Sequence, residues 1–224
     1  MLGRAATLAG TRPMIPDAAV LLPFAVAVVV IALTPGPDMT FFLSRALVQG
    51  RAAGLAAMAG ASTGILVHTM LVALGLSTLI VAAPTAFLTL KVVGALYLAW
   101  LAVQAIRHGS ALTLPDRPAP GASLAATWAR GLGINLLNPK IILFFMTFLP
   151  QFVRPDDPHA AAQLVILGFL FIAIALVITV PMILAADRVA GALRTRPRIA
   201  RSIDFIFASV FMAFAAHLLL GRAR

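Results

Sequence analysis

Long, predominantly apolar stretches make up most of the chain, and short segments containing proline or charge separate them. The stretches cover residues 18–37, 54–83, 85–106, 124–153, 160–186 and 203–221. Each is close to or longer than the roughly 20 residues that a helix needs to cross the hydrocarbon core of a bilayer. The pattern predicts an all-α fold, a polytopic membrane helical bundle of six transmembrane helices in a single domain over residues 15–224.

The composition agrees with a chain that lies in lipid. Apolar residues make up 62% of the sequence and charged residues 11%, which leaves too little polar surface to coat a water-soluble core. The formal net charge of +10 does not indicate a nucleic-acid partner, because the charges are sparse and the segments between them are apolar. The expected partner is the lipid bilayer. No metal-ligand spacing, P-loop or nucleotide fingerprint is present, so no cofactor is expected, and the oligomeric state stays open.

The arginines are distributed unevenly among the predicted loops. If the N-terminus is outside, the inner loops hold ten arginines, namely 45, 51, 107, 117, 130, 188, 194, 196, 198 and 201. The outer side holds only five, at positions 4, 12, 154, 222 and 224. Because positive residues concentrate in cytoplasmic loops, this distribution predicts an inner-membrane protein with both termini outside.

The segment before the first apolar stretch differs from the rest. Residues 1–14 lack a convincing apolar core and cleavage site, so they are a poor signal peptide. Met14 begins a more natural opening directly before the first predicted helix. Residues 1–14 are therefore interpreted as an N-terminal extension, either disordered or the result of a start codon assigned too early.

Two of the apolar regions are interrupted in their middle by residues that cannot continue a helix. As one helix, residues 18–50 would be about 50 Å long, which exceeds the thickness of a bilayer. The interruption in this region contains Pro35, Gly36, Pro37 and Asp38, and the one in residues 124–153 contains Asn135, Asn138, Pro139 and Lys140. Each region is expected to form two half-helices, since proline removes a backbone donor and restricts the residue before it.

The broken regions open the first and second sets of three helices. Because three helices end on the side of the membrane opposite to where they began, the second set starts from the other side. The pattern therefore predicts two inverted three-helix repeats with broken first and fourth helices. Such breaks indicate the central site of a secondary transporter, because freed backbone groups are tolerated where they line a cavity. A zwitterionic amino acid would suit half-helix ends. The alternative is that proline merely kinks both helices and that Asp38 and Asn138 are plain helix caps.

Five short motifs, in order along almost the whole chain, resemble those of a known family. They are residues 35–38 (PGPD), 51–55 (RAAGL), 64–68 (GILVH), 90–98 (LKVVGALYL) and 135–140 (NLLNPK). Together they resemble the LysE/RhtB family of amino-acid exporters. The resemblance implies six membrane helices, export of amino acids or their derivatives, and coupling to the proton-motive force. It does not select a substrate.

Ionisable residues inside the apolar stretches are the candidates for function, because charge in hydrocarbon is costly. Asp38, the only acid between residues 17 and 116, is expected to handle a cation or a proton. Lys140 is expected to pair with Asp38, to meet a substrate carboxylate or to snorkel. His68 is expected to have one of two roles. It either relays protons or contacts substrate, or it is a packing histidine without a functional role. Lys91 lies near the outer turn, where extension of its side chain to the interface is the simpler interpretation.

A serine motif offers a second class of function. Residues 60–64 match G-x-S-x-G, which in hydrolases places a nucleophile on a strand-to-helix turn. The match lies inside a predicted membrane helix, where Gly60 and Gly64 are more simply a small-residue packing stripe. An intramembrane serine protease that uses Ser62 and His217 remains an alternative, as does a channel without coupled transport.

Overall fold

The computed structural model describes residues 16–34, 36–82, 84–108, 122–154, 157–195 and 197–220, and these ranges contain helices and no strands. In chain order the elements are α1 (Ala18–Leu33), α2 (Pro37–Gln49), α3 (Arg51–Ala82), α4 (Pro84–His108), α5 (Leu124–Leu136), α6 (Pro139–Leu143), the π-helix η1 (Phe144–Phe148), the 3-10 helix η2 (Leu149–Phe152), α7 (Ala160–Leu184), α8 (Ala186–Thr195) and α9 (Pro197–Leu220). The predicted extension, residues 1–14, lies outside the described residues, as does most of the loop after α4. The all-α fold class is confirmed.

Several of these helices have the length and composition of membrane spans. In the described part of the chain, two helices qualify alone, α7 and the segment Arg51–Gly75 of α3. Two bent pairs, α1 with α2 and α5 with Pro139–Phe152, qualify as broken spans, which makes up to four. The predicted third and sixth spans correspond to α4 and α9, helices of 25 and 24 residues. Their side chains are described only in part, so the count of six stays a prediction.

Both predicted helix breaks are present. The chain bends by 53° between α1 and α2 and by 52° between α5 and α6. Thr34, after the last residue of α1, is extended with φ −67° and ψ 117°, and Asn138, before Pro139, is extended with φ −73° and ψ 109°. An extended residue before proline is what the proline ring imposes on its neighbour.

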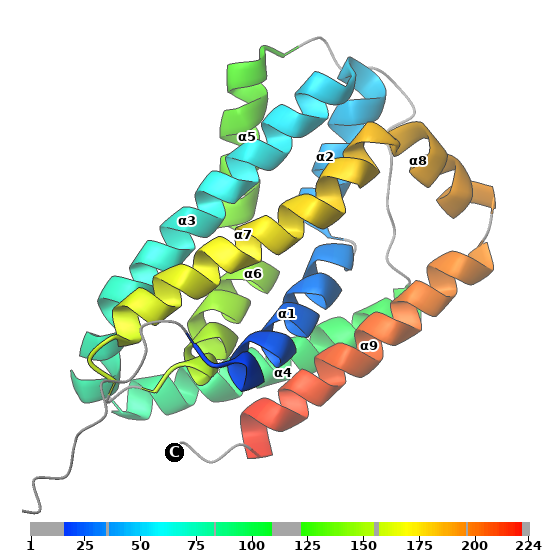
Figure 1. Ribbon diagram of the computed structural model, residues 1–224. Coiled ribbons are helices and arrows are strands. Elements are labelled where there is room, and N and C mark those ends of the chain that lie inside the picture. Colours follow the sequence, from blue (N-terminus) through cyan, green and yellow to red (C-terminus); the bar gives the residue numbers. More distant parts are fainter. Residues whose placement is uncertain are drawn as a thin grey trace, which may run out of the picture.

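Some of the helix contacts can be compared with the predicted inverted repeat, which stays a prediction. If the first half, α1 to α4, is equated with α5 to α9, then α3 corresponds to α7 and α4 to α9. In the structure α3 packs against α5 and α7 packs against α1, which are equivalent pairs. Each of the two helices α3 and α4 also contacts its own counterpart in the other half, α7 and α9 respectively. Figure 1 shows α4 and α9 side by side along one edge of the bundle.

Glycines set the closest approach between helices. A Cβ added to Gly60 of α3 would fall on the carbonyl oxygen of Trp128 in α5, and one added to Gly131 of α5 would fall on that of Ala57 in α3. A Cβ at Gly64 would press against the Asn135 side chain. The predicted packing role of Gly60 and Gly64 is therefore confirmed, and it brings α5 directly against α3.

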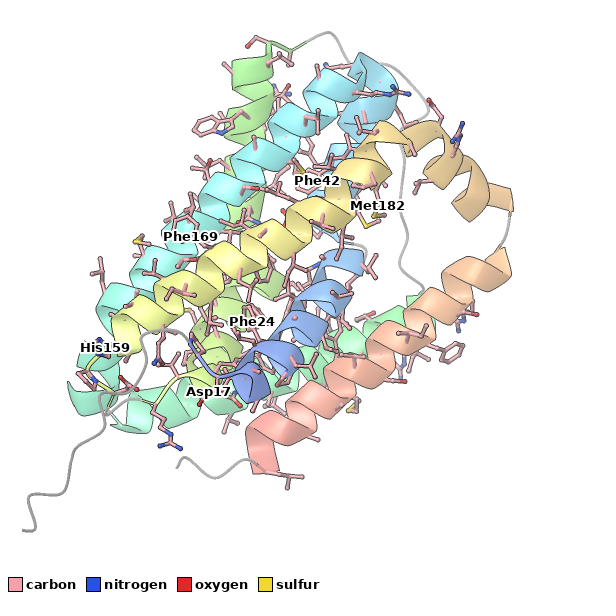
Figure 2. All side chains as sticks on the ribbon, in the orientation of Figure 1. Asp17, Phe24, Phe42, His159, Phe169 and Met182 are labelled. Carbon is pink, nitrogen blue, oxygen red and sulfur yellow. The ribbon has the colours of Figure 1, made fainter. Side chains whose placement is uncertain are left out.

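Two apolar clusters fill the interior, one toward each end of the bundle. The first joins α1, η1 and α7 through buried residues that include Phe24, Phe145 and Phe171. The second joins α2, α3 and α7 and includes Phe42 and Met58. Figure 2 shows Phe24 and Phe42 well apart along the bundle. Large apolar side chains also cover the outside, such as Leu74, Val177 and Leu22, which are 77%, 75% and 71% exposed, as expected of a surface in contact with lipid.

Two segments differ from the sequence prediction. Residues 187–202 were expected to be a loop, but α8 occupies most of this segment and α9 begins at Pro197 rather than at residue 203. Because α8 has only 10 residues and contains charge, a search for long apolar stretches cannot detect it. The fourth apolar region also ends as the π-helix η1 and the 3-10 helix η2, a departure from α-helix that the sequence pattern did not predict.

Candidate functional site

The two half-helices that follow the breaks begin in the same way. Gly36 and Asn138 are the N-caps of α2 and α6, and Pro37 and Pro139 are the first helical residues. Proline is well suited to the first helical position because it has no backbone N–H to leave unsatisfied. The next residue is Asp38 in α2 and Lys140 in α6. The two half-helices therefore carry opposite charges at equivalent positions.

Asp38 is held from the opposite half of the molecule. The side-chain amides of Asn135 and Asn138 each donate a hydrogen bond of 3.0 Å to its Oδ2 atom. The carboxylate also lies in the first turn of α2, where the helix dipole favours negative charge. Its other oxygen, Oδ1, is buried and has no hydrogen-bond partner among the described residues. Asp38 therefore keeps one acceptor oxygen available inside the protein.

Lys140 reaches in the opposite direction, toward the end of α1. Its Nζ atom donates to the carbonyl oxygens of Thr34 at 3.1 Å and Ile31 at 3.3 Å. These carbonyls belong to the last turn of α1, where a helix leaves acceptors unsatisfied and its dipole favours a cation. Gly36 permits this approach, since a Cβ there would lie 3.2 Å from Nζ. Lys140 was predicted to pair with Asp38, to meet a substrate or to snorkel. In the structure its Nζ atom is instead hydrogen bonded to the two backbone carbonyls.

Asn138 combines two roles. Its side-chain oxygen accepts a hydrogen bond of 3.1 Å from the backbone N–H of Lys140, which caps α6. Its amide nitrogen simultaneously donates to Asp38. The capping role and the site role, which the sequence presented as alternatives, are therefore compatible for this residue. For Asp38 the cap interpretation is wrong, because the N-cap of α2 is Gly36.

His68 of α3 lies at the same junction. Its ring is hydrogen bonded to the backbone of Asn135 and is within electrostatic reach of Asp38. The ring also packs on Phe145 of η1, with centroids 5.8 Å apart. Its Nε2 atom is buried and has no hydrogen-bond partner among the described residues. His68 thus has the contact of a packing histidine, and its electrostatic interaction with Asp38 leaves a role as proton relay open.

A cavity of about 60 Å³ lies where these elements meet. Asp38 and Lys140 both line it, so the two equivalent positions face one buried space. Residues from α1, α2, α3, α5, α6 and α7 contribute to its walls. These walls include members of both apolar clusters, such as Phe171 of the first and Phe42 of the second. The cavity therefore lies between the two clusters, in the interior of the bundle.

Not all predicted site residues meet there. Pro35 lies outside the described residues, and so do the side chains of Lys91 on α4 and His217 on α9. Thr179 and Met58 also line the cavity and were not predicted from the sequence. Both lie in long apolar helices, and without the three-dimensional arrangement nothing in the sequence separates a cavity-facing side chain from a packing one.

Comparison with known proteins identifies the family. The model of the family described as LysE type translocator matches residues 29–222. A homoserine/homoserine lactone efflux protein of Salmonella typhimurium is 34% identical over 87% of this chain and 92% of its own length. A leucine efflux protein of Klebsiella pneumoniae is 32% identical over 88% of this chain and 93% of its own length. An uncharacterized membrane protein of Vibrio cholerae is 30% identical over 92% of this chain and 100% of its own length.

No solved structure matches the chain. The family comparison overturns the serine-protease alternative, and Ser62 agrees with this because it lies within the continuous helix α3 and not on a strand-to-helix turn. The similarity extends over nearly the whole chain and includes both broken helices. The chain is therefore a multi-pass membrane protein and a member of the LysE type translocator family, which consists of transporters and not of enzymes.

Proposed function

We propose that this protein is a secondary active exporter of amino acids or their derivatives across the inner membrane, and that its substrate binds in the cavity between the two helix breaks. One observation carries the site assignment: Asp38 and Lys140, at equivalent positions of the two predicted repeats, line the same cavity. The Salmonella and Klebsiella relatives, a homoserine/homoserine lactone efflux protein and a leucine efflux protein, support the amino-acid substrate.

The two charges match the two ends of an amino acid. The free Oδ1 oxygen of Asp38 can accept from a substrate ammonium, and the Lys140 ammonium can bind a substrate carboxylate. Paired opposite charges inside a protein offset the cost of removing each of them from water, provided that hydrogen bonds satisfy the remaining atoms. Here Asn135 and Asn138 satisfy Oδ2 of Asp38, so the site is built around a carboxylate before substrate arrives.

Proton coupling follows from competition at Asp38. A carboxylate that has taken up a proton is neutral and holds a substrate ammonium less strongly than an ionised one does. A proton that arrives from outside therefore favours release of the substrate to the outside, and loss of that proton to the inside restores the binding form. His68, which lies beside Asp38, is proposed to belong to the proton pathway.

Efflux from proteoliposomes tests this proposal. Vesicles that contain the purified protein are loaded with homoserine or leucine, and efflux is compared with and without a pH gradient that is acidic outside. We expect the gradient to accelerate efflux and the Asp38→Asn variant to lose both efflux and acceleration. The control is Asp17→Asn, since Asp17 is exposed at the start of α1. Efflux that ignores the gradient would instead indicate a channel, and no efflux of any amino acid would refute the proposal.

We further propose that both termini lie outside the cell membrane. Figure 1 shows the α2–α3 turn, the start of α5 and α8 toward one end of the bundle, and Figure 2 shows Asp17 and His159 toward the other. Arg51, Arg130 and Arg188, which were predicted to be cytoplasmic, belong to the elements at the first end. Because the chain has no cysteine, single-cysteine variants report on side. A membrane-impermeant maleimide should label Pro158→Cys in intact cells and Ser123→Cys only after permeabilisation, and the reverse result would refute the orientation.

A further inference from the structure

The charged groups of the cavity are limited to its two poles. Among the described residues that line it, Asp38 and Lys140 are the only charged ones. Four lining residues are polar and uncharged, namely Thr34, Ser62, Asn135 and Thr179, and the others are apolar. A substrate charge beyond the α-ammonium and α-carboxylate would therefore meet no opposite charge in the cavity, and an unpaired charge in such a place is costly.

The hydrogen-bonding atoms at the poles fit a free amino acid. Among the lining residues, two buried acceptor atoms have no partner in the described part of the chain, Oδ1 of Asp38 and Oδ1 of Asn135. A substrate ammonium has three N–H donors, and Oδ1 of Asp38 can accept from one of them. At the other pole the Lys140 ammonium also has three donors, two of which are used by the carbonyls of α1. Its third donor is left for a substrate carboxylate.

The wall formed by α3 and α7 carries neither of the two charges, so we assign the substrate side chain to this wall. Its members include Met58, Ala61 and Leu176, which are apolar, and the hydroxyl-bearing Ser62 and Thr179. The Thr179 hydroxyl donates to the Ala175 carbonyl at 2.7 Å, with the Met58 sulfur 3.2 Å away. A wall of this kind accommodates an aliphatic or hydroxyl-bearing side chain and offers no partner to a charged one.

We infer that the transporter accepts free α-amino acids with uncharged side chains, and that it discriminates against substrates with charged side chains and against carboxyl-blocked derivatives such as lactones. The inference rests on the proposed function, because it concerns the same site. A lactone has an ester carbonyl in place of the carboxylate, so it cannot form the charged contact with Lys140. The expected discrimination against each excluded class is at least tenfold.

A mixed-load experiment tests the inference with the wild-type protein. Proteoliposomes are loaded with equal concentrations of the twenty common amino acids, homoserine and homoserine lactone, and efflux of each is followed by mass spectrometry. We expect leucine, homoserine and other neutral amino acids to leave at least ten times faster than lysine, arginine, aspartate, glutamate and the lactone. Comparable efflux of any excluded compound overturns the inference but leaves the proposed exporter intact. No efflux of any amino acid overturns both.

A substitution in the wall tests the physical reason. The Ser62→Asp variant adds a carboxylate to the uncharged wall, whereas Ser62→Asn adds a side chain of the same shape without the charge. We expect Ser62→Asp to raise the ratio of lysine efflux to leucine efflux at least tenfold and Ser62→Asn to leave it unchanged. An equal ratio in the two variants, both of which still export leucine, would show that charge in this wall does not select the substrate.

Discussion

Substitution of Gly131 by alanine tests whether the contact between α3 and α5 is as close as the structure shows. A Cβ at this position would fall on the Ala57 carbonyl oxygen and would lie 3.0 Å from the carbonyl carbon and 3.1 Å from the Cα atom. All three are backbone atoms of a helix, and they cannot turn aside as the end of a flexible side chain can. The two helices would have to separate.

The size of the effect follows from two opposing contributions. Overpacking a well-packed interior costs about 1–3 kcal/mol, whereas alanine is favoured over glycine inside a helix by about 1 kcal/mol. The net expectation is a loss of up to about 2 kcal/mol in the free energy of unfolding relative to wild type, and of about 1–3 kcal/mol relative to a glycine-to-alanine change without a clash. For a chain of this size, that loss corresponds to a melting temperature up to about 8 °C below that of wild type.

Gly133 provides the matched control on the same helix. A Cβ there has nothing within 4 Å, so Gly133→Ala gains the helix preference without a clash and should leave the melting temperature unchanged or raise it. Both variants are measured by thermal unfolding in one detergent at one heating rate. If Gly131→Ala is as stable as Gly133→Ala, the close approach of α3 and α5 is wrong.

Three further predictions concern the breaks and their surroundings. Gly64→Ala should push Asn135 away from Asp38, since the added Cβ meets the Asn135 side chain. We expect efflux from proteoliposomes to fall at least tenfold, and unchanged efflux would contradict this. Asn138→Ala should lower the melting temperature through loss of a cap worth about 1 kcal/mol, whereas Asn138→Ser should restore stability but not efflux. Gly50 has φ +89°, so Gly50→Ala should cost about 1–3 kcal/mol, measured by thermal unfolding, and a stability equal to that of wild type would refute the strain.

The sequence predicted the helices and both breaks well because the signals for them are local. Proline position and apolar length locate the ends of α1 and α7 without knowledge of their neighbours, and the interruptions before Asp38 and Lys140 appear as short motifs. The helix α8 was missed because it is too short and too polar for a pattern based on membrane thickness.

The partners within the site were harder to predict because they lie far apart in the chain. The sequence identified Lys140 but not its bonds to the Thr34 and Ile31 carbonyls, which are backbone atoms 106 and 109 residues away. It identified Asn135 but not its hydrogen bond to Asp38, which lies 97 residues away in the chain. Such pairings depend on how the two repeats pack.

The exchange of partners between the repeats has a mechanical consequence. Asp38 belongs to the first half and is bonded by Asn135 and Asn138 of the second, whereas Lys140 belongs to the second half and is bonded by carbonyls of α1 in the first. Movement of one half against the other, which alternating access requires, must therefore break buried polar contacts at both breaks. A buried polar group left without a partner is costly, so an empty transporter resists the movement. A zwitterion bound between Asp38 and Lys140 supplies replacement partners for both charges and lowers that cost, which links movement to the presence of substrate.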